Sequence, residues 1–131
     1  MRLVICILAV TLYGGAALAD PCTDFAKDYS ARGEAECAFY NFGKSDASLN
    51  EIYQKVVRRL KVDGRSLKPL IEAERAWLVE RDTRCANKAK EFDLIDATGT
   101  ATIIDCKTDW TKDRIGILKD YLTPMHRRAS H

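Results

Sequence analysis

Charged side chains fall on what should be the buried face of one helical segment, residues 66–92. At about 100° per residue its apolar side chains share a face, with Trp77 on the edge. Glu74 and Arg81 lie in the middle of that face, two helical turns apart, and Asp82 borders it. An ordinary amphipathic helix keeps its charges on the opposite side. Inward charges could supply catalytic carboxylates, or they could form carboxylate–guanidinium pairs that join helices.

Two further charges, Asp46 and Arg114, are expected on the inner faces of neighbouring helices. A glycosidase needs two carboxylates, and Glu74 with Asp82 or Asp46 could supply them. No histidine or activated serine motif accompanies these carboxylates, so we predict no catalytic residue. The alternative is that Arg81 and Arg114 bind the three carboxylates in the helix interface. Arginine suits this role because its planar fork makes two hydrogen bonds to a carboxylate.

Helices must position these residues, because no stretch shows the alternation typical of a strand. Capping residues, apolar stripes and breaks predict a short helix capped by Thr23 and ended by Gly33, then one or two helical turns around Cys37 and a break at Asn41-Phe42-Gly43. A helix is expected from Ser45 to about Lys61, and another from Ser66 to Phe92 with Pro69 in its first turn. A polar turn over residues 93–100 and a helix from Thr102 to about Leu122 follow. The expected fold is all-α: a small, disulfide-stapled, antiparallel helical bundle with three main helices and a short N-terminal one.

Residues 1–19 have the pattern of a secretory signal peptide. Arg2 precedes an apolar run, and Ala17-Leu18-Ala19 is a small-x-small cleavage site. The run is shorter than the about twenty residues that a membrane span needs. We therefore expect cleaved export rather than a retained anchor, a periplasmic or secreted location, and one domain over residues 20–131 with a short mobile C-terminal tail.

Cleavage would leave four cysteines, Cys22, Cys37, Cys85 and Cys106. An even number in a small exported domain indicates two disulfides, for which three connectivities are possible. We favour Cys22–Cys37 and Cys85–Cys106, because each pair is close in sequence and can close across one helix–helix turn.

Charge and histidine content argue against several functions. Removing Arg2 leaves 20 basic and 19 acidic residues, a balance that argues against nucleic-acid binding. The only histidines, His126 and His131, lie in the tail, and the cysteine spacings are not those of a zinc finger. We expect no metal and no cofactor.

Three places could meet a protein partner. One is the predicted loop that contains Tyr40, Phe42 and Lys44. We favour packing of its aromatic rings on neighbouring helices, and the alternative is an exposed aromatic anchor for a partner. The others are the turn over residues 93–100 and the tail residues Arg127 and Arg128.

The motif residues together resemble the N-terminal domain of the lysozyme inhibitor LprI family, long catalogued as a domain of unknown function. The resemblance covers residues 37–118 and is carried by Asp46, Leu49-Asn50, Tyr53, Glu74-Arg75-Ala76-Trp77-Leu78, Arg81-Asp82-Thr83-Arg84-Cys85, Cys106 and Arg114. The family usually has glutamine at the position of Glu74. The resemblance implies an exported, non-enzymatic domain whose protein partner is lysozyme. The alternatives are a structural or envelope-maintenance domain and, less favoured, a carboxylate-dependent hydrolase. The sequence does not indicate an oligomeric state.

Overall fold

The computed structural model describes residues 20–25, 30–91, 93 and 96–123. The expected signal peptide and the tail residues Arg127 and Arg128 lie outside these ranges. So does part of the predicted first helix.

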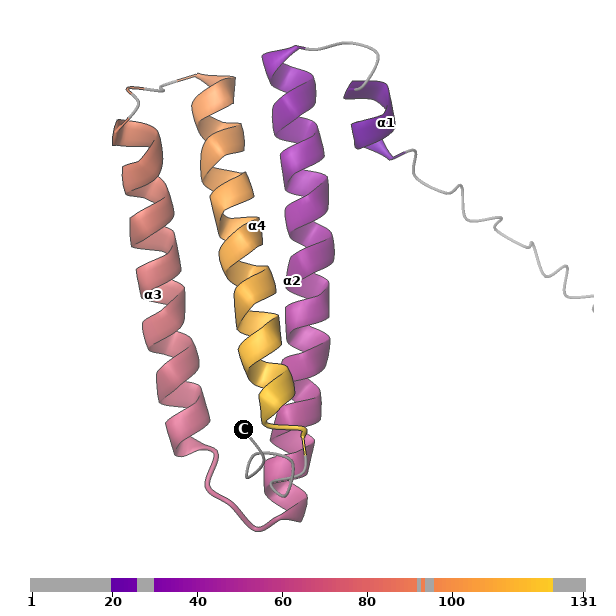
Figure 1. Ribbon diagram of the computed structural model, residues 1–131, viewed down its shortest axis with the longest axis vertical. Coiled ribbons are helices and arrows are strands. Elements are labelled where there is room, and N and C mark those ends of the chain that lie inside the picture. Colours follow the sequence, from indigo (N-terminus) through magenta and orange to yellow (C-terminus); the bar gives the residue numbers. More distant parts are fainter. Residues whose placement is uncertain (1–19, 26–29, 92, 94–95, 124–131) are drawn as a thin grey trace, which may run out of the picture.

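The described chain is all-α, as predicted, with the helices α1 (Pro21–Phe25), α2 (Ala31–Val62), α3 (Lys68–Glu91) and α4 (Ala97–Asp120). The three long helices run antiparallel to their sequence neighbours, and α4 lies between α2 and α3 (Figure 1). Both outer helices pack against α4, and the short α1 packs against α2. Between the described helices α2 and α3, no two Cα atoms lie within 8 Å. Among the three long helices, α4 therefore makes the close backbone contacts with both of the others, while α2 and α3 meet through side chains.

The predicted break at residues 41–43 is wrong, because α2 continues through it for 32 residues. Its N-cap is Ser30, whose hydroxyl accepts a 3.1 Å hydrogen bond from the Gly33 amide, so Gly33 lies in the first turn of this helix rather than ending the previous one. Ser45, the predicted cap, is buried inside the helix. A glycine within a helix costs only about 1 kcal/mol, and the packing of Ala38 and Phe42 against α4 offsets that cost.

The other helix starts are also set by side chains that accept from free backbone amides. In α1 the carboxylate of Asp20 accepts from the Cys22 amide at 2.9 Å, so Thr23 is not the cap. In α3 the Ser66 hydroxyl accepts from the Lys68 amide at 3.2 Å, and Pro69 lies in the first turn, as predicted.

Helix α4 begins five residues before the predicted Thr102. Its N-cap is Asp96, which accepts from the amides of Thr98 and Gly99. An aspartate is a stronger cap than a threonine, and the buried Gly99 is tolerated within the first turn. The predicted turn over residues 93–100 is correspondingly shorter.

Two apolar clusters and two disulfides hold the helices of the bundle together. The larger cluster, formed by all three long helices, comprises Leu49, Val56, Leu60, Leu70 and Leu118. The smaller one joins α2 to α4 through Ala38, Ala101 and Ile104. Cys22–Cys37 links α1 to α2, and Cys85–Cys106 links α3 to α4, which confirms the favoured connectivity.

Candidate functional site

Glu74 and Arg114 form an ion pair between α3 and α4. The Arg114 Nε and Nη2 atoms both donate to Oε1 of Glu74, at 2.8 and 2.6 Å. The two side chains are 13% and 11% exposed, so water screens the pair little. These two members of the predicted charge network therefore meet inside the helix interface.

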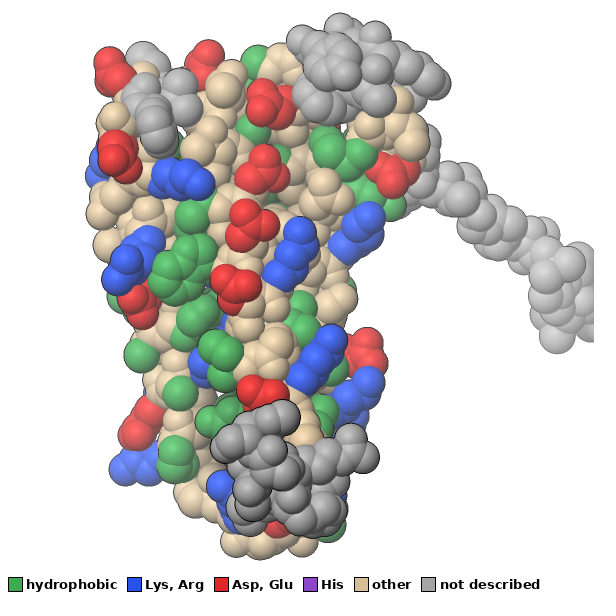
Figure 2. Space-filling model, in the orientation of Figure 1, with side chains coloured by type: hydrophobic (Ala, Val, Ile, Leu, Met, Phe, Trp, Pro, Cys, Tyr) green, Lys and Arg blue, Asp and Glu red, His purple; other side chains and the backbone are tan. Residues whose placement is uncertain are grey.

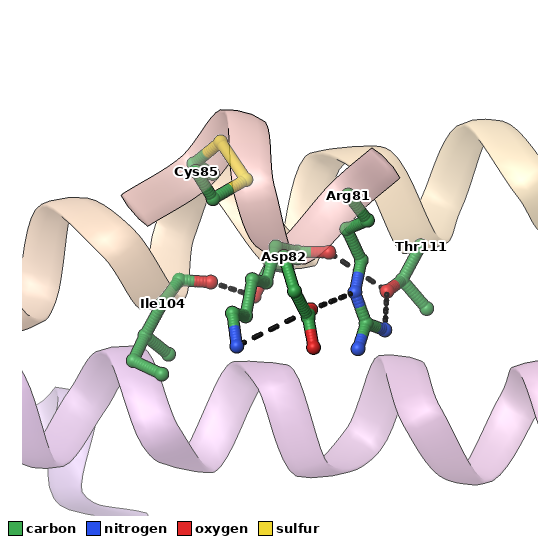
Figure 3. Close-up of a disulfide and its surroundings, with 8 residues drawn as sticks. Arg81, Asp82, Cys85, Ile104 and Thr111 are labelled. Atoms are coloured by element: carbon green, nitrogen blue, oxygen red, sulfur yellow. Dashed lines mark hydrogen bonds and ion pairs between the residues drawn. A yellow bond between two sulfur atoms is a disulfide. The ribbon is translucent and has the colours of Figure 1, made fainter. Parts of the chain in front are cut away.

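Arg81 is the most deeply buried charge of the motif, with 6% of its surface exposed. Its Nε donates to Oδ1 of Asp82 at 2.9 Å, and its Nη1 lies 3.4 Å from the Thr111 hydroxyl on α4. Figure 3 shows this arrangement beside the Cys85–Cys106 disulfide. Asp82 also pairs with Lys107 of α4, at 3.3 Å. One carboxylate is thus shared by two cations from two helices.

The environment of Asp82 favours its ionised form. Burial raises its pKa, but hydrogen bonds and charge from Arg81 and Lys107 together outweigh burial, so the pKa lies below its ordinary value. The carboxylate is half exposed. Its main effect is to neutralise the buried guanidinium of Arg81.

Trp77 connects the two charge pairs. The guanidinium carbons of Arg81 and Arg114 lie 5.0 and 5.8 Å from its ring centroid, within cation–π range. Arg81 also lies 5.5 Å from the ring centroid of Phe42 on α2. Phe42 is half-buried and packs against the smaller core cluster, which agrees with the favoured prediction of packed rings rather than with the alternative of an exposed partner anchor.

Asp46 does not join the network, contrary to the prediction. Its carboxylate accepts a 3.3 Å hydrogen bond from Asn50, one turn further along α2. Both arginines find their acids on α3 itself, and no Cα atom of α2 lies within 8 Å of that helix. Asp46 is also in the middle of α2, rather than in the first turn of a separate helix.

A groove of about 360 Å³ lies between α2 and α3, and we call it the motif groove because family-motif residues from both helices line it. Its lining residues are Asp46, Leu49, Asn50, Tyr53, Ile71, Glu74, Arg75, Trp77 and Leu78. Asp82 is not among them. Two carboxylates, Asp46 and Glu74, border this groove, and Glu74 is paired with Arg114.

A larger groove of about 620 Å³ lies between α2 and α4, and we call it the polar groove. Its lining residues are Asn41, Lys44, Ser45, Ser48, Asp105, Thr108, Asp109, Lys112 and Ile115. Lys44, one of the predicted partner contacts, extends over the Tyr40 ring at 4.4 Å from its centroid. Tyr40 is half-buried, so the exposed partner candidate of this segment is Lys44.

A comparison with known protein families matches residues 22–118 to the family described as lysozyme inhibitor LprI. The chain belongs to the LprI family. No curated protein and no solved structure matches it. The match includes both disulfides, the whole of α2 and α3, and α4 up to residue 118.

Several residues of this LprI-family site were not found from the sequence. Thr111 and Lys107 complete the surroundings of Arg81 and Asp82, and Asp105 and Ser45 line the polar groove. Thr111 gives a usable signal, because it lies seven residues before the buried Leu118 on the same face of α4.

Within the described ranges, no helix combines the length and apolarity that crossing a membrane would require. The same ranges contain no group of three or more potential metal-ligating side chains.

Proposed function

We propose that this LprI-family chain is an exported, non-enzymatic interaction domain that inhibits lysozyme. The observation that carries the proposal is the family match over residues 22–118, which spans nearly all of the described chain. The motif residues Glu74, Arg81, Asp82 and Arg114 would then act as the scaffold that fixes helix positions.

The geometry of the carboxylates supports a non-enzymatic role. A general acid or base must exchange protons with a substrate. Glu74 is bound by Arg114, and Asp82 is bound by Arg81 and Lys107. Both acids thus serve as counter-ions to buried or half-buried cations.

Two features support export. Both disulfides join separate helices, and bonds of this kind persist in oxidising compartments. The leader pattern over residues 1–19 agrees with that location. The domain would act in the periplasm or outside the cell.

The test is the clearing of a peptidoglycan suspension by lysozyme, followed as loss of turbidity. Residues 20–131, with both disulfides formed, should slow the clearing in proportion to their concentration. Protein that has been reduced and alkylated provides the control and should lose the effect. Undiminished clearing at a large molar excess of folded protein would refute inhibition. Clearing by the domain without lysozyme would instead favour the hydrolase alternative.

A further inference from the structure

Basic charge is concentrated where α2 ends and α3 begins, at the end of the bundle where α4 also ends (Figure 1). We call residues 55–68 the basic turn. This segment contains six of the 21 basic residues of the chain and one of its 19 acidic residues. The six are Lys55, Arg58, Arg59, Lys61, Arg65 and Lys68. Acidic side chains, by contrast, follow one another along α4 on the face shown in Figure 2.

Three cations of the basic turn are not neutralised by the bundle. Arg58, Lys61 and Arg65 are exposed, and they form no ion pair among the described residues. The other three each have an acid one helical turn away: Arg59 with Asp63, Lys55 with Glu51 and Lys68 with Glu72. The free charge of this end therefore belongs to three neighbouring side chains.

The fold of the turn does not require these cations. The amides of Gly64 and Arg65 donate to the carbonyls of Lys61 and Leu60, at 3.1 and 2.8 Å, and Gly64 has a φ of 65°. These are the two bonds of a Schellman motif, in which the residue at the position of Arg65 commonly makes an apolar contact with the helix. Arg65 and Lys68 also lie at the start of α3, where the helix dipole disfavours cations, and the first turn of α3 has no acid. Lys61 alone suits the dipole, at the end of α2.

Val62 adds an apolar side chain to the same surface. It is the last residue of α2 and is 85% exposed, more than any other large hydrophobic residue that the structure describes. Arg58 lies one helical turn before it, on the same side of the helix, and Arg65 follows it across the turn. Removing such a side chain from water is favourable. The turn thus combines an apolar tip with unpaired positive charge.

We propose that the basic turn binds the surface of an anionic lipid bilayer. Arg58, Lys61 and Arg65 would contact lipid phosphates, and Val62 would enter the headgroup region. Segments that lie on membranes combine these two features, apolar side chains for the acyl boundary and cations for the anionic headgroups. An acidic protein or polysaccharide would also attract the cations, but it gives no reason for the exposed valine. The long axis of the bundle would then point away from the membrane, because the turn lies at one end of it (Figure 1).

The first experiment measures sedimentation of the disulfide-bonded domain, residues 20–131, with vesicles of phosphatidylglycerol and phosphatidylcholine. The domain should sediment with these vesicles and not with pure phosphatidylcholine, and added salt should release it because salt screens exposed charges. Equal binding to the neutral vesicles would overturn the proposal. So would release by glycerol phosphate beyond that caused by sodium chloride of the same ionic strength, because it would show a site for a single phosphate group.

Matched charge variants locate the contact. The triple variant R58Q/K61Q/R65Q should weaken vesicle binding at least tenfold, because each basic residue near an anionic surface contributes about fivefold. The control R32Q/K88Q/K90Q removes the same charge from exposed positions at the opposite end of the bundle and should change binding less than about twofold. Equal losses in both triple variants would reduce the effect to net charge and refute the site. Should R58Q/K61Q/R65Q fail to fold, Arg65→Gln carries the test, with a loss of about fivefold.

Val62 distinguishes a bilayer from any other anionic partner. Val62→Ser leaves every charge in place and should weaken vesicle binding about threefold or more, because less apolar surface is buried. Val62→Trp should strengthen it, because tryptophan favours the level of the headgroups. Unchanged binding in both variants would show a purely electrostatic contact and refute the bilayer as the ligand. The clearing assay with lysozyme contains no lipid, so failure of the inhibitor function and failure of this proposal are separate results.

Discussion

Replacing Glu74 by alanine would leave the guanidinium of Arg114 without its acid in the interface between α3 and α4. That guanidinium is only 11% exposed, so little water can replace the lost carboxylate. Removing one partner of a buried ion pair costs about 3–5 kcal/mol. Small domains have about 5–15 kcal/mol of stability in total, so this one substitution would remove a large share of it.

The assay is thermal and urea unfolding of the disulfide-bonded domain, followed by circular dichroism. At about 4 °C for each kcal/mol in a domain of this size, Glu74→Ala should lower Tm by about 12–20 °C. Glu74→Gln retains an acceptor oxygen and should lose less than half as much. The control is Glu80→Ala, which breaks an exposed pair with Arg84 on the same helix and should cost less than about 1 kcal/mol.

A double-mutant cycle distinguishes pairing from simple loss of packing. Glu74→Ala and Arg114→Ala should not be additive, and their coupling energy should lie within about 0.5–3 kcal/mol. If Glu74→Ala is no more destabilising than Glu80→Ala, the guanidinium is well hydrated after all. The reasoning that assigns Glu74 a scaffold role would then fail.

Three further substitutions test separate parts of the structure. Replacing Cys85 and Cys106 by serine should cost about 3 kcal/mol in urea unfolding, because a loop of 21 residues is no longer closed; an unchanged midpoint would contradict this. The pKa of Asp105 is raised in the folded state, so its ionised form destabilises the fold at pH 7. Asp105→Asn should therefore raise Tm at pH 7, and the gain should disappear as the pH falls below about 4. The same gain at pH 3 would exclude this cause. Gly43→Ala should add about 0.5–1 kcal/mol, because a Cβ at this mid-helix position meets no atom within 4 Å; a lower Tm would show that the helix needs glycine there.

Local sequence signals predicted the parts of the fold that local interactions determine. The stripe of α3 placed Glu74 and Arg81 on its inner face, and the structure has both inside the bundle. Pro69 and Ser66 marked the helix start to within two residues. These signals act within one helical turn, so they can be read from a single sequence.

The errors arose where packing overrides local preference. Asn41-Phe42-Gly43 has poor helix propensity. The packing of Phe42 and its neighbours against α4 stabilises the continuous helix by more than that low propensity costs. The partner of Asp46 was wrong for a related reason. Sequence spacing showed that Asp46 faces inward, but not that the backbones of α2 and α3 stay more than 8 Å apart or that Asp46 bonds to Asn50.

The position of α4 also explains why neither groove could be predicted. Short turns require helices that are neighbours in sequence to be antiparallel, but they do not decide which helix contacts both of the others. In the structure α2 and α3 border one groove, while α2 and α4 border the other.

The two kinds of charge in this chain therefore have different consequences. Glu74, Arg81 and Arg114 are paired with opposite charges at the interface of α3 and α4, so changing them should first alter stability. Asp105 and Asp109 have no comparably close partner, so removing either carboxylate should not destabilise the fold. If this division is correct, substitutions of Glu74 and of Asp105 should act additively on the free energy of unfolding, because they lie in separate interactions. A strong coupling between them would mean that the charge pairs of α3 also shape the polar groove.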